Sequence, residues 1–272
     1  MNGYAQLDQQ TFKQFADLIY QKAGIHLAEH KHSLVSARLG KRMRFLKIND
    51  FDEYYSFVQN EPSQRELIEL LDAISTNVTY FYREPKHFEV LSSILQDWAA
   101  AGQTRFRIWC AASSTGEEPY TIALTLAETL PSTRDVKILA TDISTTVLNT
   151  ARKGIYEAKK LDKISKRLID KYFAPLSNKG TKMFRVQDQI KDLIRFSWLN
   201  LSTPPFPMRG PLDVIFCRNV MIYFDNDVRQ RLLNEMYRLL KPGGYLMVGH
   251  AESLSGLMSS FKSVRPSVYR KV

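Results

Sequence analysis

Strand-like and helix-like segments alternate along the chain from residue 105 to residue 254. Each short apolar run ends in small or polar residues, and a longer segment with helical spacing of its apolar residues follows most of them. The strand-like runs are 105–113, 136–144, 211–224 and 245–254, and the helix-like runs are 117–130, 144–156 and 225–244. Strands connected through helices form parallel sheets with right-handed crossovers. The alternation therefore predicts an α/β domain over 106–272 with a mostly parallel sheet.

Residues 170–200 break this alternation. Short strand-like runs lie on either side of the turn sequence Ser177-Asn178-Lys179-Gly180. We expect a small antiparallel insertion over about 170–195, after which the chain returns to the main sheet at 194–199.

The first 75 residues show helical periodicity and no strand-like alternation. Val35, Leu39 and Met43 recur at helical spacing, for example, and fall on one face of a helix. A small all-helical domain is predicted over 1–75, and residues 76–105 are predicted to link it to the α/β domain.

The 272 residues carry a net charge of +10, which suits an acidic partner such as nucleic acid, anionic lipid or an acidic protein. Residues 30–48 hold six Lys or Arg and no acidic residue. No apolar run is long enough to cross a membrane, and the polar start of the chain lacks the core of a signal peptide. We expect a cytoplasmic protein without membrane insertion, in which Cys110 and Cys217 are buried free thiols and no metal is bound.

The loop at 112–118, Ala-Ser-Ser-Thr-Gly-Glu-Glu, is the first candidate for a ligand site. It follows a predicted strand, and ligands of open parallel sheets bind beyond the carboxyl ends of the strands. Its small side chains permit close approach to the main chain, but Glu117 and Glu118 at the start of the next helix disfavour a phosphate. An acidic loop suits a ligand with positive charge, such as the sulfonium and ammonium of S-adenosylmethionine. The alternative is that both acids only complement the helix dipole.

Two polar residues follow other predicted strands. Asp142 can accept hydrogen bonds from ribose hydroxyls, or it can cap the next helix. Asn200 can read an adenine edge, or it can shape a turn.

Six segments together give a specific family resemblance. They are TNVTYFYREPKHF (76–88), RIWCAASSTGEEPYTIAL (107–124), ATDIST (140–145), FSWLNL (196–201), DVIFCRNVMIYF (213–224) and LKPGGYLMVGHAESL (240–254). In this order they resemble the CheR family of chemotaxis-receptor glutamate O-methyltransferases, over nearly the whole chain. The resemblance implies a Rossmann-like S-adenosylmethionine-dependent methyltransferase domain behind the helical domain. It also implies that glutamate side chains of receptors become methyl esters and that S-adenosylhomocysteine is released.

The resemblance carries residue roles over to this chain. The implied cofactor contacts are Asn77, Thr79, Arg83, Glu117, Asp142, Asn200, Leu201, Arg218 and Asn219. Arg83 and Tyr223 are implied to flank the transferred methyl group. The loop at 174–181 has a single glycine, which departs from members that tether to a receptor tail peptide. Ser113 and Tyr82 replace the commoner Cys and Phe with near-isosteric side chains.

The basic run at 30–48 is predicted to meet the acidic cytoplasmic helices of a receptor. The docking residues that we expect are Lys31, Arg38, Lys41 and Arg42, which lie beside the apolar stripe on a helical wheel. A basic face that contacts only solvent is the alternative.

Two other functions compete with receptor methylation. The high pI suggests a nucleic-acid methyltransferase, but the loop Arg218-Asn219-Val220-Met221 lacks the Pro-Pro-aromatic motif of enzymes that methylate exocyclic amines. A cofactor-binding scaffold without catalysis is the third possibility. We expect a monomer that does not bind nucleic acid.

Overall fold

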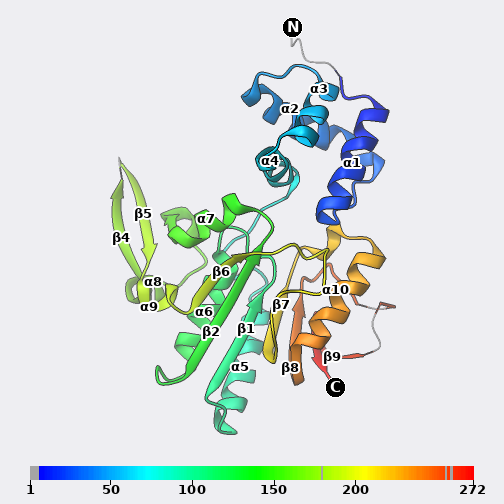
Figure 1. Cartoon of the computed structure of the whole chain (residues 1–272). Helices are drawn as coiled ribbons and strands as arrows, with labels where there is room; N and C mark the ends of the chain where they lie inside the picture. The colour runs from blue at the N-terminus through cyan, green and yellow to red at the C-terminus, as the bar shows by residue number, and fades with distance from the viewer. Residues whose placement is uncertain (1–5, 179, 255, 258–259) are drawn as a thin grey trace.

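The computed structural model describes residues 6–178, 180–254, 256–257 and 260–272. Its described strands form a seven-stranded sheet in the order β6-β2-β1-β7-β8-β10-β9 (Figure 1). The strands are β1 (Arg105–Cys110), β2 (Asp135–Asp142), β6 (Ile194–Trp198), β7 (Leu212–Cys217), β8 (Leu240–Val248), β9 (Phe261–Arg265) and β10 (Val268–Lys271). The first five pair in parallel, and β10 pairs antiparallel to both β8 and β9. The predicted mostly parallel α/β sheet is confirmed.

The order of the strands creates a crevice beside β1. The chain passes from β1 to β2 on one side and returns later to β7 on the other side. Loops that leave neighbouring strands in opposite directions open a space at the carboxyl ends, where ligands of such folds bind.

Helices cover both faces of the sheet. They are α5 (Lys86–Ala100), α6 (Glu117–Thr129), α7 (Thr145–Lys153) and α10 (Asn226–Leu239). Side chains alternate across a strand, so Ile108 and Cys110 of β1 join one apolar cluster with α5 and α6. Trp109 joins the opposite cluster with Leu232 and Met236 of α10. Packing on both faces therefore holds β1, and with it the loop that follows β1, in a fixed position.

The segment expected to be a linker contains helix α5. Its residues Phe88, Leu91 and Leu95 are buried in the core of the sheet domain. The α/β domain therefore includes this helix, and the chain crosses from the helical domain at residues 75–85.

The insertion forms a separate three-stranded antiparallel sheet in the order β3-β5-β4. Its strands are β3 (Ile155–Glu157), β4 (Phe173–Asn178) and β5 (Thr181–Val186), and the helices α8 (Lys166–Tyr172) and α9 (Asp188–Lys191) flank it. The hairpin of β4 and β5 projects from one side of the main sheet (Figure 1). Lys179, in the predicted turn, lies outside the described residues.

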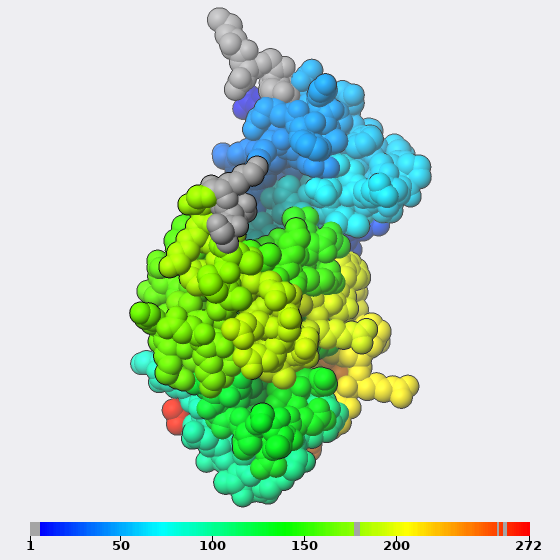
Figure 2. Space-filling view, turned by 90° about the vertical axis from the view of Figure 1, so that its left-hand side faces the viewer, coloured from blue at the N-terminus to red at the C-terminus, as the bar shows by residue number. Residues whose placement is uncertain are grey.

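The described part of the N-terminal domain, from residue 6 on, has four α-helices, α1 (Gln9–Ala23), α2 (His32–Leu46), α3 (Phe51–Asn60) and α4 (Arg65–Ile74), and a short 3₁₀ helix at Glu29–Lys31. Asp8 caps α1 by accepting a hydrogen bond from the N–H of Thr11, and Gly24 ends α1 in the left-handed conformation. The predicted apolar stripe of Val35, Leu39 and Met43 is buried. This domain lies at one end of the molecule, above the segment that carries the small sheet (Figure 2).

Two further predictions concern the cysteines and membrane insertion. Cys110 and Cys217 are free and buried, as expected. Among the described residues, no helix is both long and apolar enough to cross a membrane.

Candidate active site

A cavity lies at the carboxyl ends of β1, β2 and β7, and the helical domain covers it. Ala111 follows β1 and Asp142 ends β2, whereas Ala23 ends α1 and Ile25 lies two residues after that helix. Of the residues predicted for cofactor binding or catalysis, nine line this cavity: Asn77, Thr79, Arg83, Asp142, Asn200, Leu201, Arg218, Asn219 and Tyr223. Segments far apart in the sequence thus meet at one site.

The loop after β1 lines the cavity with small residues. Ala111, Ala112 and Ser114 all face it. Gly116 turns the chain into α6 with φ 99°, and a Cβ there would lie 2.7 Å from the Tyr156 hydroxyl and 2.9 Å from the Ala151 Cβ. Only glycine fits this turn, so the close packing against α7 and β3 holds the loop in place.

Asp142 occupies the end of β2 with its carboxylate largely buried. Its two oxygens accept hydrogen bonds from the N–H of Ser114 at 2.8 Å and of Ser144 at 3.0 Å. Burial raises the pKa of this carboxyl, and the N–H groups of Ser144 and Ser114 partly offset that effect. Asp142 therefore supports the start of α7 and also lines the cavity, so both roles considered for it remain compatible with the geometry.

Asn200 joins the two domains. Its Nδ2 donates to the carbonyl oxygen of Lys22 at 2.7 Å, and its Oδ1 accepts from the N–H of Ser202 at 3.0 Å. The amide therefore shapes a turn while it lines the cavity, so both considered roles remain compatible with the geometry.

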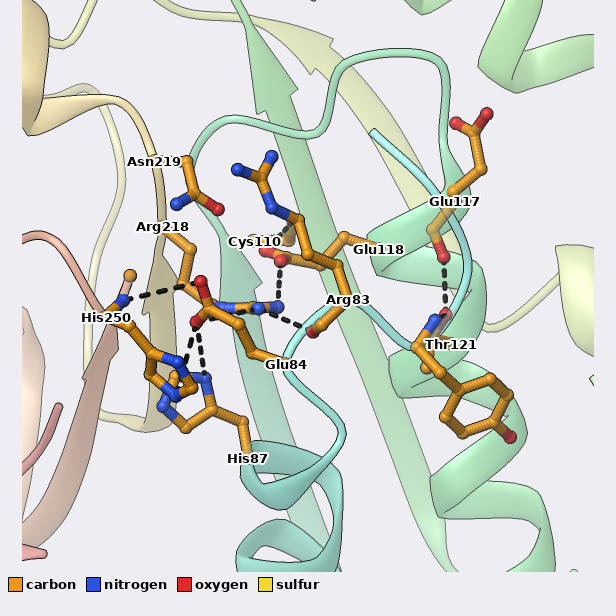
Figure 3. Close-up of polar contacts among 12 residues, drawn as sticks. Arg83, Glu84, His87, Cys110, Glu117, Glu118, Thr121, Arg218, Asn219 and His250 are labelled. Carbon is orange, nitrogen blue, oxygen red and sulfur yellow. Dashed lines mark hydrogen bonds and ion pairs between the residues drawn. The ribbon is translucent and has the colours of Figure 1, made fainter. Parts of the chain in front are cut away.

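Arg218 is buried between two carboxylates, as Figure 3 shows. Its Nη1 pairs with Glu118, and its Nη2 lies 3.1 Å from Glu84 Oε2 and donates to the Arg83 carbonyl oxygen at 2.6 Å. Burial raises the pKa of Glu118, and the charge of Arg218 opposes that rise. Arg218 therefore anchors the main chain at Arg83 to the sheet.

The two predicted catalytic residues sit at the rim of the cavity on different segments. Arg83 Nη1 donates to the carbonyl oxygen of Val78 at 3.0 Å. Tyr223 lies in a short 3₁₀ helix after β7, and its carbonyl oxygen accepts from the N–H of His26 at 2.8 Å. Ile25 and Phe224 form a β-bridge beside this bond. The helical domain thus holds the main chain at Tyr223.

Glu117 does not line the cavity. Its carboxylate is fully buried, bonded to Lys160 Nζ and to the Thr115 hydroxyl, each at 2.6 Å. Figure 3 shows it pointing away from the Arg218–Glu118 pair. A contact between Glu117 and a cofactor would require its side chain to leave Lys160, whereas Glu118 already faces the cavity.

Two of the four predicted docking residues are engaged within the helical domain. Arg38 donates to the carbonyl oxygens that end α4, including Ser75 at 3.1 Å, and to the Thr76 hydroxyl at 2.9 Å. Arg42 binds both oxygens of the buried Glu66, at 2.8 and 2.6 Å. The expectation that these two side chains face a partner therefore needs revision. Lys41 is exposed on α2, and Lys31 Nζ lies 5.9 Å from the centre of the Tyr223 ring.

Glu84, His87 and His250 place three ligand-type atoms within 4.8 Å of one another. Burial lowers the pKa of His87 to about 4, so this imidazole is neutral at pH 7. Arg218 Nη2 lies 3.1 Å from Glu84 Oε2, however, and its charge opposes a second cation there. We assign no metal to this cluster.

Glu252 is a residue of the site that sequence reasoning did not single out. It is buried and bonds to the loop after β7, and its sequence signal is a carboxylate near the end of the predicted strand 245–254. Glu84 was missed because its partner, Arg218, is 134 residues away.

Comparisons with known proteins agree with this architecture. Residues 10–75 match the family described as "CheR methyltransferase, all-alpha domain", and residues 77–270 match "CheR methyltransferase, SAM binding domain". A chemotaxis protein methyltransferase of Salmonella typhimurium is 39% identical over 95% of this chain and 88% of its own length. A relative of the same name from Borreliella burgdorferi is 40% identical over 93% of this chain and 91% of its own length.

Among solved structures, TrmN from Thermus thermophilus aligns with 67% of this chain and 48% of that chain, at a TM-score of 0.41 and 18% identity. The two family matches divide the sequence between residues 75 and 77 and leave only short terminal segments unmatched. S-adenosylmethionine is the cofactor of the matched domain, and the chain belongs to the CheR methyltransferase family.

Proposed function

We propose that this protein transfers a methyl group from S-adenosylmethionine to glutamate side chains of chemotaxis receptors, giving methyl esters and S-adenosylhomocysteine. The observation that carries this proposal is that Arg83 and Tyr223, from segments 140 residues apart in the sequence, line the same cavity. The names of the relatives support the link to chemotaxis.

The lining of the cavity fits the cofactor chemically. Buried Asp142 offers carboxylate oxygens for ribose hydroxyls, and Ala111 and Ala112 leave room for a ligand against the main chain. Glu118 and Asp142 supply negative charge for a cationic ligand. When bound, S-adenosylmethionine supplies an electrophilic methyl group on a sulfonium.

The acceptor side of the reaction needs orientation more than proton transfer. A glutamate carboxyl has a reference pKa of about 4.3, so it is already ionised at pH 7 and needs no general base. Arg83 binds the Val78 carbonyl oxygen through one of the five N–H donors of its guanidinium, and the fork geometry suits a carboxylate. The Tyr223 hydroxyl supplies a further donor. Holding reactants in line contributes roughly 7–11 kcal/mol to such reactions.

The receptor docks, in this proposal, on the outer face of α2. Leu34, Lys41 and Phe45 are spaced at i, i+7 and i+11 and therefore share one face of the helix. Phe45 is 75% exposed and Leu34 is 46% exposed, and Lys41 adds positive charge between them. Such a face suits an amphipathic helix with acidic residues.

Transfer of tritium from labelled S-adenosylmethionine to a receptor cytoplasmic fragment tests the function. We expect label on the receptor that mild base releases, since methyl esters hydrolyse in base. A matched fragment whose methylated glutamates are replaced by alanine should take up no label. Base-stable label, or label on added RNA or DNA instead of the receptor, would contradict the proposal.

A further inference from the structure

Four main-chain N–H groups converge on one buried carboxylate next to the site. Glu252 Oε2 accepts from Asn219 and Gly249, each at 2.7 Å, and its Oε1 accepts from Val220 at 2.8 Å and Met221 at 2.7 Å. The side chain is only 2% exposed. A buried carboxylate needs such donors, and the donors of an irregular loop equally need an acceptor.

The loop held in this way has an uncommon shape. Asn219 adopts φ 58°, the left-handed conformation that costs energy for residues other than glycine. Gly249 packs against it so closely that a Cβ there would lie 2.6 Å from Asn219 Nδ2 and 2.7 Å from Glu252 Oε2. Glu252 and Gly249 together therefore enforce the conformation of Asn219.

The same loop supplies one wall of the cofactor cavity. Arg218, Asn219 and Val220 line the cavity, and Tyr223 follows one turn later. Glu252 is not among the residues that line the cavity, and its carboxylate bonds to Asn219, Val220 and Met221 of this loop. A shift of its carboxylate would move Asn219 without touching a bound ligand.

We propose that Glu252 is a positioning residue for cofactor binding, acting by holding the Asn219–Met221 loop in its binding conformation. The inference rests on the proposed role of Asn219 in cofactor binding. The alternative is that Glu252 only stabilises the fold. A positioning role predicts weaker cofactor binding even when the variant is fully folded. A purely stabilising role predicts lower stability but unchanged cofactor affinity of the folded variant.

Glu235 provides a matched control. It is also a buried carboxylate, 6% exposed, and accepts the N–H of Phe206 at 2.8 Å, but it lies on α10 and does not line the cavity. Glu252→Gln replaces one oxygen by an NH₂ group that faces two main-chain N–H donors. Glu235→Gln removes the charge that Glu235 contributes to its ion pair with Arg238. Both variants should therefore lose thermal stability.

The test measures S-adenosylhomocysteine affinity by calorimetry at a temperature where circular dichroism shows each variant folded. We expect Glu252→Gln to bind at least about tenfold more weakly than the wild type and Glu235→Gln to bind within about twofold of it. Wild-type affinity in Glu252→Gln overturns the inference, and so does an equal loss in Glu235→Gln. If Asn219→Ala weakens binding while Glu252→Gln does not, only this inference fails; if neither does, the proposed site fails too.

A second variant covers the case in which Glu252→Gln does not fold. Glu252→Asp keeps the negative charge but is one methylene shorter, so it cannot reach all four N–H groups. We expect an affinity about threefold or more below the wild type, with faster hydrogen exchange at the amides of Val220 and Met221. Wild-type affinity and exchange in this variant would overturn the inference.

Discussion

Arg83 shows how the main chain and the side chain of one residue divide two tasks. Its carbonyl oxygen is tied to buried Arg218 at 2.6 Å, and its guanidinium extends to the cavity rim. The anchoring bond belongs to the main chain, so a change of the side chain leaves it in place.

Replacing Arg83 by alanine is expected to separate folding from catalysis. The Arg83→Ala protein should keep a melting temperature near that of the wild type. Its kcat/KM for receptor methylation should fall at least about a hundredfold, on the order of 3 kcal/mol, because the acceptor carboxylate loses its orienting donor. Arg209→Ala, a change of an exposed arginine before β7, serves as the control and should retain full activity. Near-normal turnover in Arg83→Ala would remove this side chain from the mechanism.

His87 makes the stability of the protein depend on pH. Burial, assisted by the nearby charge of Arg218, lowers the pKa of His87 from 6.5 to about 4. Between these values the unfolded chain binds a proton that the folded protein does not, so the free energy of unfolding falls as pH drops from about 6.5 to about 4. Glu84 and His250 lie beside the ring, and the charge of Glu84 raises the pKa of His87 and so limits the shift.

The His87→Gln variant should lose this part of the pH dependence. Urea unfolding at pH 7, 6, 5 and 4.5 measures it: the wild type should lose stability more steeply than the variant across this range. The exposed His30→Gln change is the control, and it should leave the steep wild-type slope intact. Parallel curves for the wild type and His87→Gln would contradict the assignment.

Neighbouring residues also mark the limit of sequence reasoning at this scale. Glu117 and Glu118 are adjacent on a helix and point about 100° apart, so the motif alone cannot decide which faces the cavity. Lys160, 43 residues later, binds Glu117 away from the cavity. The sequence likewise does not reveal that Arg42 is bound within the domain, because only tertiary packing brings it next to Glu66.

At the level of elements, helix α2 has one face buried in the helical domain and one face exposed on the surface. Val35, Leu39 and Met43 pack into the domain, and Arg42 closes the buried pair with Glu66. Lys41 and Phe45 face outward. Changes on the two faces should therefore have different consequences.

Arg42→Ala should lower the free energy of unfolding by about 1–3 kcal/mol, since it leaves the buried Glu66 carboxylate without its cation. The pair is partly exposed, which limits the cost.

Lys41→Glu combined with Phe45→Ala should leave the melting temperature unchanged. That double variant should raise the KM for the receptor several-fold, without altering S-adenosylhomocysteine affinity. Thermal melts, calorimetry and methylation kinetics at low salt measure these effects. An unchanged KM in the double variant would exclude the outer face of α2 as the docking surface.

The elements that the sequence predicts best are those with complete local patterns. β1, β2 and β7 are rich in apolar residues, and α7 carries both Ser144 as its N-cap and Gly154 as its stop. Helix α5 also has apolar residues at helical spacing, Phe88, Leu91 and Leu95, although we expected residues 76–105 to be a linker. β9 is exposed along most of its length and takes its place through pairing with β10, a signal that local pattern does not contain. β8 begins at Leu240, so the sequence Lys241-Pro242-Gly243-Gly244 lies within a strand, although it favours the end of a helix.

Across the whole molecule, the cavity belongs to both domains. Ala23 and Ile25 cover it from the helical side. Hydrogen bonds between described residues of the two domains include Asn200 to Lys22, His26 to Tyr223 and Tyr20 to Asp225. A cofactor bound there contacts, and therefore stabilises, both domains together.

S-adenosylhomocysteine should accordingly raise the melting temperature of the whole chain in a single transition. At about 100 times its dissociation constant, the gain in free energy of unfolding is about 2.7 kcal/mol. Scanning calorimetry, with fluorescence probes placed in each domain, measures the shift. Two transitions, of which only that of the α/β domain moves with ligand, would show that the helical domain does not take part in binding.

Tyr20→Phe, which removes one hydrogen bond between the domains, should reduce the cooperativity of the melt without changing the lining of the cavity.

The covering of the cavity by Ala23 and Ile25 also orders events during synthesis on the ribosome. The helical domain leaves the ribosome before the wall formed by residues 218–224, which follows about 200 residues later. Until then, Ala23 and Ile25 have no complete cavity to cover. S-adenosylmethionine can therefore stabilise the two domains together only late in translation.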